Sequence, residues 1–281
     1  MKLLITGSSG YVGGFIAADA KRNGDEIIHL SRTTPATGQW ISFDLSRPTP
    51  KLPFADALIH CAFDHIEWHY RGGEGDDAKG FLVRNLEGSL NLFKAAKAAG
   101  VPKVILLSSR AVYDGYPAST RLVESLPLNP TTLYGQMKWE LEKSLKSLGL
   151  IDISFRATGV YGQSIPGGPH KWADLFARFE QGKAIEPRAG TELHGEDLAA
   201  ASRLALTLPA TQIAGKAFNL SDIMVDRHEL LTRYAKHKGI DWPLPKAVSN
   251  VAKVEMDCTN FKKLGWTPRA WKGLESFIQS F

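Results

Sequence analysis

Short apolar runs alternate with longer helix-forming stretches through the first half of the chain. The runs at residues 2–6, 26–30, 40–43, 57–61, 104–108 and 151–156 have the length and apolar character of buried parallel strands. The stretches at residues 11–23, 80–99 and 132–148 predict helices, and Gly100 with Pro102 marks the end of the second. Strands that alternate with helices predict an α/β fold, a doubly wound parallel sheet with helices on both faces.

The pattern changes after residue 162. Residues 162–169 hold three glycines and two prolines, which predicts a loop. Beyond this loop, expected helices at residues 172–181, 196–206, 226–238 and 270–280 are mixed with short strands such as 217–220. We therefore predict a sheet domain, residues 1–162 with returning segments at about 192–225, and a small C-terminal lobe, residues 163–191 and 226–281.

The composition is that of a globular protein of 281 residues, with 43% hydrophobic and 22% charged residues. The net charge of +5 suits an anionic ligand, but no run of lysine and arginine argues for nucleic acid. No apolar run approaches the ~20 residues that span a bilayer, so we expect no membrane partner and a cytoplasmic location. Cys61 and Cys258 lie far apart in sequence, which favours free thiols in a reducing compartment.

Three glycines follow the first predicted strand and open the first predicted helix. Gly7 permits a tight turn, Gly10 lets the backbone approach a phosphate, and Gly13 allows the helix to pack closely on the strand. A dinucleotide pyrophosphate would then lie at the N-terminus of the helix, where free N–H groups and the helix dipole favour an anion. The alternative is a glycine-rich turn without a ligand.

The ends of the next strands carry the residues that would hold the rest of a dinucleotide. Ser31 and Arg32 end the second strand with a hydroxyl and a guanidinium, which suit a 2′-phosphate and favour NADP over NAD. Asp44 could accept a hydrogen bond from the adenine amino group, or it could be a plain turn aspartate. The residues predicted to line the cofactor are Gly7, Ser9, Gly10, Tyr11, Val12, Gly13, Ser31, Arg32, Asp44, Leu45, Cys61, Ala62, Ser108, Tyr134 and Lys138.

Tyr134 and Lys138 are four residues apart, so they share one face of the predicted helix. A free phenol with a pKa of about 10 is a poor base at neutral pH, and a nearby ammonium stabilises the phenolate. Ser109, at the end of the fifth strand, can polarise the reacting oxygen, and Asn85 could organise the lysine through water. The predicted catalytic residues are Ser109, Tyr134, Lys138 and Asn85; the alternative is an amphipathic surface pair.

These motifs together make the chain resemble a known family. They appear in the order Gly7-x-x-Gly10-x-x-Gly13, Ile59-His60-Cys61-Ala62, Asn85-Leu86-Glu87-Gly88-Ser89-Leu90-Asn91-Leu92, Ser108-Ser109-Arg110-Ala111-Val112-Tyr113 and Tyr134-x-x-x-Lys138, followed by Arg156-Ala157-Thr158-Gly159, His194-Gly195-Glu196-Asp197-Leu198 and Leu264-Gly265-Trp266-Thr267-Pro268. The chain resembles the extended short-chain dehydrogenase/reductases, specifically their NAD-dependent epimerase/dehydratase group. The resemblance implies a Rossmann-like fold, Tyr134 as acid/base with Lys138 as its partner, and a C-terminal substrate lobe. It also implies a homodimer in which the helices near residues 80–99 and 132–148 form a four-helix bundle.

The chain departs from that family's pattern at three points. Where 4,6-dehydratases of the group carry an Asp-Glu pair, this chain has Arg110 and Ala111, which argues against dehydration. Where UDP-sugar epimerases hold the diphosphate with an asparagine and an arginine, it has Gly159 and Gly190, with Arg188 near enough to substitute. A length of 281 residues is also short for a sugar-nucleotide epimerase.

The segment at residues 63–79 follows the fourth strand and is a candidate loop over the substrate. His65 and His69 are four apart, but no third ligand at a sensible spacing supports a metal site, so we predict none. The residues predicted to contact the substrate are Phe63, His65, Arg110, Thr158 and Arg188.

The leading functional hypothesis is an NAD(P)-dependent epimerase of a sugar or nucleotide-sugar, acting through a transient ketone. The first alternative is an NADPH-dependent reductase or dehydrogenase of a small carbonyl compound or keto-sugar. The second is a non-catalytic regulator that senses a dinucleotide, and the joint presence of Ser109, Tyr134 and Lys138 counts against it.

Overall fold

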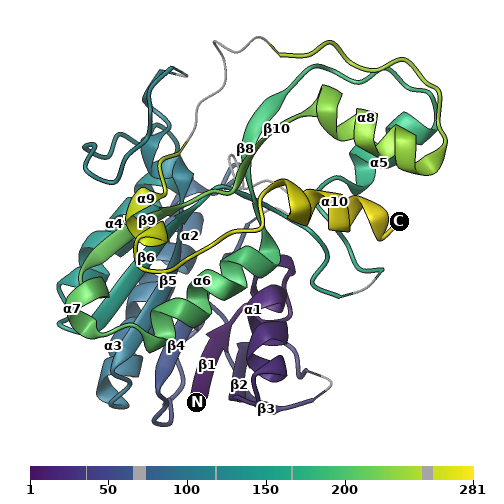
Figure 1. Cartoon of the computed structure of the whole chain (residues 1–281). Coiled ribbons are helices and arrows are strands. Elements are labelled where there is room, and N and C mark those ends of the chain that lie inside the picture. Colours follow the sequence, from purple (N-terminus) through teal and green to yellow (C-terminus); the bar gives the residue numbers. More distant parts are fainter. Residues whose placement is uncertain (36, 66–73, 118, 166, 249–255) are drawn as a thin grey trace.

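A seven-stranded parallel sheet forms the centre of the molecule (Figure 1). The computed structural model describes residues 1–35, 37–65, 74–117, 119–165, 167–248 and 256–281. The strands are β1 (Lys2–Thr6), β2 (Glu26–Ser31), β3 (Gln39–Ser42), β4 (Ala57–His60), β5 (Lys103–Ser109), β6 (Ile151–Ala157) and β9 (Lys216–Leu220). Their order in the sheet is β3-β2-β1-β4-β5-β6-β9, so the chain runs outward from β1 in both directions and confirms the predicted doubly wound α/β fold.

Helices cover both faces of the sheet, as predicted. On one face lie α1 (Tyr11–Arg22) and α6 (Gly195–Thr207), whose apolar side chains share a core cluster with those of β1, β4 and β6. On the other face lie α2 (Ala78–Leu82), α3 (Gly88–Ala98) and α4 (Leu133–Lys146). The short helices η2 (Arg110–Tyr113), α7 (Ala210–Ile213) and α9 (Thr259–Lys262) complete this domain. The four apolar strands β1, β4, β5 and β6 are buried because both of their faces are covered.

The helix predicted at residues 80–99 is interrupted. A π-helical turn, η1 (Val83–Glu87), separates α2 from α3 without breaking the helix direction. A π-turn is widened by one residue relative to an α-turn and recurs at functional sites. Hydrophobic spacing predicts the helix but does not register this change in hydrogen bonding.

A second sheet organises the C-terminal lobe. It has three strands in the order β10-β8-β7, namely β7 (Gly159–Tyr161), β8 (Ala189–His194) and β10 (Ile223–Asp226). None of the three was among the strands predicted from sequence, and β8 and β10 cross the predicted domain boundaries. The helices α5 (Ala173–Glu180), α8 (Arg227–Lys238) and α10 (Trp271–Gln279) pack beside it around an aromatic cluster, at the upper right of Figure 1.

The segment around α9 packs on the sheet domain, although the sequence-based division assigns it to the lobe. Its buried side chains belong to the core cluster that α1 and α6 share with the sheet; they are Met256, Cys258, Phe261 and Trp266. The chain therefore passes between the two parts several times, and the lobe is not a continuous stretch of sequence.

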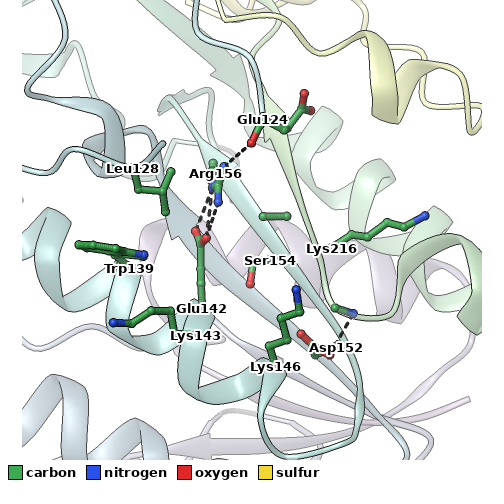
Figure 2. A pocket seen from close by; sticks show the side chains of 12 residues that line it. Glu124, Leu128, Trp139, Glu142, Lys143, Lys146, Asp152, Ser154, Arg156 and Lys216 are labelled. Atoms are coloured by element: carbon green, nitrogen blue, oxygen red, sulfur yellow. Dashed lines mark hydrogen bonds and ion pairs between the residues drawn. The ribbon is translucent and has the colours of Figure 1, made fainter. Parts of the chain in front are cut away.

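A buried ion pair joins α4 to β6 (Figure 2). Arg156 donates to Glu142 at 2.7 Å, and each side chain is 8% exposed. Ser108 donates to the same carboxylate at 2.5 Å, and Arg156 also donates to the Tyr113 hydroxyl at 2.5 Å. A cavity of about 230 Å³ lies beside this pair, toward the first residues of β6 and β9, and none of its lining residues is a predicted site residue.

We expect Arg156→Met to destabilise the protein strongly, because it leaves the Glu142 carboxylate buried without its cation. The free energy of unfolding should fall by about 3–5 kcal/mol, measured by urea denaturation. Arg121→Met is the matched control, because Arg121 pairs with Asp257 at 2.7 Å but is 74% exposed; it should change stability by less than about 1 kcal/mol. Equal losses in the two variants would contradict the structural role given to the buried pair.

Candidate active site

The loop after β1 makes a close backbone contact with the loop after β4. Gly7 has a φ of +65°, and a Cβ placed there would lie 2.9 Å from the amide nitrogen of Ala62. The N–H of Gly10 donates to the Gly7 carbonyl at 2.9 Å, and a methyl group on Gly13 would overlap that same carbonyl oxygen. Gly7 and Gly13 thus have steric reasons. Because no side chain among the described residues caps the N-terminus of α1, the cradle fits a dinucleotide pyrophosphate.

The other residues predicted at this loop lie around the start of α1. Ser9 is exposed, and Tyr11 and Val12 are half-buried. The Tyr11 hydroxyl donates to the Gly162 carbonyl at 2.9 Å, which ties α1 to the segment that follows β7.

A buried chain of hydrogen bonds holds the strand ends beneath this loop, and sequence reasoning missed it. Thr6 Oγ1 accepts from two peptide N–H groups of the loop after β4, at 3.1 and 3.0 Å, so its own proton points to Nδ1 of His60 at 2.8 Å. His60 Nε2 then carries the ring proton and donates to Ser89 Oγ at 2.8 Å. The Ser89 hydroxyl donates to the Asn85 carbonyl at 2.5 Å, which links β1, β4, α3 and η1 in one direction.

At the end of β2 the side chains differ in how they are placed. The buried Ser31 hydroxyl donates to the Thr33 carbonyl at 2.7 Å, and Arg32 is exposed.

Asp44, which follows β3, accepts from both the N–H and the hydroxyl of Ser46, at 2.8 and 2.7 Å. These bonds to Ser46 lower the pKa of Asp44. This geometry is that of a turn aspartate, the second of the two roles considered for Asp44. Leu45 is buried against α3, at the Gly88 backbone.

The catalytic candidates meet at the start of α4. Tyr134 is half-buried, and the Nζ of buried Lys138 lies 5.7 Å from the centroid of its ring. Lys138 donates to the Leu107 carbonyl of β5 at 2.8 Å, and burial lowers its pKa to about 8. The amine therefore remains an ammonium at neutral pH, as a partner for a phenolate requires.

Ser109 ends β5 and directs the next turn toward α4. Its Oγ accepts from the Ala111 N–H at 3.1 Å, which caps η2. The Ala111 carbonyl faces Gly135 so closely that a methyl group at Gly135 would overlap it. The serine and the tyrosine, 25 positions apart in sequence, thus lie on adjoining turns of the structure. Ser108 faces the opposite way, into the Glu142 network described above.

Asn85 holds the backbone of the loop that follows β4. Its Oδ1 accepts from the Asp64 N–H and its Nδ2 donates to the Asp64 carbonyl, both at 2.7 Å. The Asp64 carboxylate accepts from Arg84 at 2.5 Å, and Arg84 also donates to Asp77 at 2.9 Å. Arg84, in η1, therefore holds the Asp64 and Asp77 carboxylates close together.

The predicted substrate residues fall into two groups. Phe63 and His65 lie beside Tyr134 and Lys138. The centroids of the Phe63 and Tyr134 rings are 4.9 Å apart, and the His65 ring stacks on the Phe63 ring with a centroid distance of 4.5 Å. Cys61 is half-buried, and burial raises its pKa to about 12, so it is a thiol at neutral pH. Arg110 directly follows Ser109 in η2.

The remaining two candidates lie farther along the chain. Thr158 is buried where β6 gives way to β7, and its N–H donates to the Leu220 carbonyl at 3.1 Å. Arg188 is exposed just before β8. The structure thus brings the glycine loop, Ser109, Tyr134, Lys138 and Phe63 to the carboxyl ends of the strands, where open α/β sheets bind ligands.

The described residues contain no group of three or more His, Cys, Asp or Glu side chains that could hold a metal ion, and His69 lies outside them. None of their helices is both long enough and apolar enough to cross a membrane. The two cysteines are free thiols in the structure.

A glycine cradle at the first strand and a Tyr-Lys pair beside the fifth are the features predicted for an α/β protein of the short-chain dehydrogenase/reductase class. The sequence model of the NAD dependent epimerase/dehydratase family matches residues 3–221. The chain belongs to this family.

Known relatives support the same assignment. UDP-glucose 4-epimerase of Bacillus subtilis is 29% identical over 167 residues, which cover 54% of this chain and 49% of the relative. The match likewise spans about half the length of the UDP-glucose 4-epimerases of Streptomyces lividans and Corynebacterium glutamicum. The structure of a Thermotoga maritima UDP-glucose 4-epimerase with UDP-glucose has a TM-score of 0.79 at 20% identity, covering 100% of this chain and 98% of that one. A Bordetella bronchiseptica enzyme in complex with NAD and UDP has a TM-score of 0.79 at 20% identity, covering 99% and 94%.

Gly13→Ala should disrupt the cofactor cradle, because its methyl group would push against the Gly7 carbonyl. We expect a loss of at least tenfold in dinucleotide affinity and about 1–3 kcal/mol of stability, measured by titration and thermal melting. Gly14→Ala is the control, because the methyl group there would press on the Ser164 side chain, at 2.8 Å from Oγ and 3.1 Å from Cβ, and would meet the glycine-loop backbone at an ordinary 3.9 Å. Unchanged affinity in Gly13→Ala would remove the steric basis of the cradle.

The stability of the protein should decline in acid through His60. Burial lowers the pKa of His60 to about 3. Between that value and 6.5 the unfolded chain binds a proton that the native state does not, so stability falls as the pH drops below 6.5, by up to about 1.4 kcal/mol per unit. His194, whose pKa burial also lowers to about 3, adds a slope of the same sign. His60→Gln should flatten the fall measured by urea denaturation from pH 6.5 to 4.5, and an identical slope in both proteins would refute the assignment.

Proposed function

We propose that the protein interconverts a carbinol and a carbonyl at a sugar carbon, with Tyr134 as the acid/base. The placement of the buried Lys138 ammonium 5.7 Å from the Tyr134 ring, beside the end of β5, carries this proposal. The cofactor, when bound, donates or accepts the hydride. The glycine cradle, Ser31 and Arg32 are the residues of this chain that would hold it.

The protein's own groups act on the proton and on the substrate oxygen. The Tyr134 hydroxyl exchanges a proton with that oxygen, Lys138 lowers the energy of the resulting phenolate, and Ser109 donates a hydrogen bond that polarises the carbonyl. Asn85 acts through the backbone of Asp64, which supports Phe63 against the tyrosine ring. This assignment gives each predicted catalytic residue a task that matches its contacts.

The outcome of the reaction depends on the fate of the ketone. If the ketone is retained and reduced again on its other face, the protein is an epimerase, which the relatives favour. If it is released, the protein is a reductase or dehydrogenase. The exposed Arg32 at the end of β2 supports NADP as the preferred cofactor, and NAD, which accompanies related structures, is the alternative. A homodimer formed through α3 and α4 stays a prediction.

Tyr134→Phe should lower the turnover rate by ~10²–10⁴-fold, because only the proton-transferring oxygen is removed. Cofactor affinity should stay within threefold of wild type, measured by separate NADPH and NADH titrations, and tighter NADPH binding would support the NADP preference. Tyr234→Phe removes a phenol oxygen from α8 and serves as the control; it should leave the rate unchanged. A Tyr134→Phe enzyme with wild-type turnover would overturn the proposed chemistry.

A further inference from the structure

Lys171 and Glu192 lie between the two ends of the candidate active site. Glu192 of β8 pairs in register with Gly159 of β7, and Gly159 is two residues beyond Ala157, which pairs with Ser109. On the other side, the N–H of Lys171 donates to the hydroxyl of Tyr11, the first residue of α1, at 3.4 Å. The two side chains, 21 residues apart, thus meet on segments that connect through strand register toward Ser109 and through the Lys171 backbone to Tyr11.

The side chains of Lys171 and Glu192 form an ion pair. The Lys171 ammonium donates to Oε2 of Glu192, whose side chain is 10% exposed, while that of Lys171 is 31% exposed. The pair also explains the glycine at position 159. A Cβ there would overlap the Lys171 ammonium and lie 2.6 Å from Glu192 Oε2, so no side chain can occupy that place while the pair is formed.

The pair offers both hydrogen-bond donors and an acceptor. Among the residues that the structure describes, Oε1 of Glu192 has no hydrogen-bond partner, and the Lys171 ammonium has N–H groups beyond the one it gives to Oε2. A hydroxyl group donates and accepts, so a sugar or polyol can bond to both partners at once. A diphosphate only accepts, and the Glu192 carboxylate would repel it.

We propose that Lys171 and Glu192 form a hydroxyl-binding subsite that selects a neutral sugar or polyol rather than a sugar carrying a nucleotide diphosphate. This inference rests on the proposed function and narrows its substrate class. Arg188 is exposed near Glu192 and acts on it electrostatically. Removing the carboxylate therefore leaves a locally cationic surface, which makes the proposal testable with a diphosphate probe.

The test measures the affinity of UDP for the cofactor-loaded, full-length protein by isothermal titration calorimetry. We expect wild type to bind UDP no tighter than millimolar, and Glu192→Gln to bind it at least tenfold tighter. Glu186→Gln, which removes the same charge from an exposed position of the lobe, should leave UDP affinity unchanged. Micromolar UDP binding by wild type that Glu192→Gln does not strengthen would overturn the proposal and leave Lys171 and Glu192 as a strut between β8 and the segment before α5.

A turnover measurement gives a second readout. Wild type should convert D-galactose, L-arabinose or xylitol in preference to UDP-glucose, and a preference for UDP-glucose would overturn the proposal. If Glu192→Gln fails to melt cooperatively, Lys171→Gln replaces it: the unpaired carboxylate should then weaken UDP binding further, and tighter binding would refute the subsite. Failure of the proposed function is separate, since it would appear as lost cofactor binding or as full activity in Tyr134→Phe.

Discussion

The approach of backbone to backbone between the loops after β1 and β4 is the constraint on which the rest of the site depends. Gly7 allows it, Gly13 lets α1 pack against the first of these loops, and the chain of hydrogen bonds from Thr6 through His60 to Ser89 fixes the strand ends beneath it. That chain ends on the carbonyl of Asn85, so the floor of the cofactor site and the π-turn that supports the catalytic face form one connected unit. A displacement of either loop would therefore shift both the glycine loop and the π-turn η1.

The proposed catalytic residues come from one helix but face different surroundings. Lys138 is buried beside β5, whereas Tyr134, one turn earlier on α4, is half-buried at the rim of the sheet. A single helix can therefore keep the Lys138 charge buried and still leave the Tyr134 side chain partly exposed, as the proposed chemistry requires. The cost of burying that amine is limited by its bond to the Leu107 carbonyl and by the Glu142 carboxylate, which favours its charged form.

Most of the sheet domain follows from the sequence, because its strands are continuous apolar runs with glycine or proline at their ends. The first strand and helix were placed to within one residue, and the pair Tyr134 and Lys138 is visible from helical spacing alone. The second sheet could not be predicted, since β7 has three residues and its neighbours lie far away in sequence. The ion pair of Lys171 and Glu192 could not be predicted for the same reason. The two residues are 21 positions apart in no recognisable motif, and only the folded chain brings them together.

The interleaving of the two sheets has a consequence for how the chain folds as it is synthesised. The edge of β6 stays open until β9 is made, and α5 and β8 of the lobe precede β9 along the chain. The third strand of the small sheet, β10, follows directly after β9. A ribosome therefore delivers the closing strands of both sheets within a few residues of each other, so the two sheets should become complete together rather than one after the other.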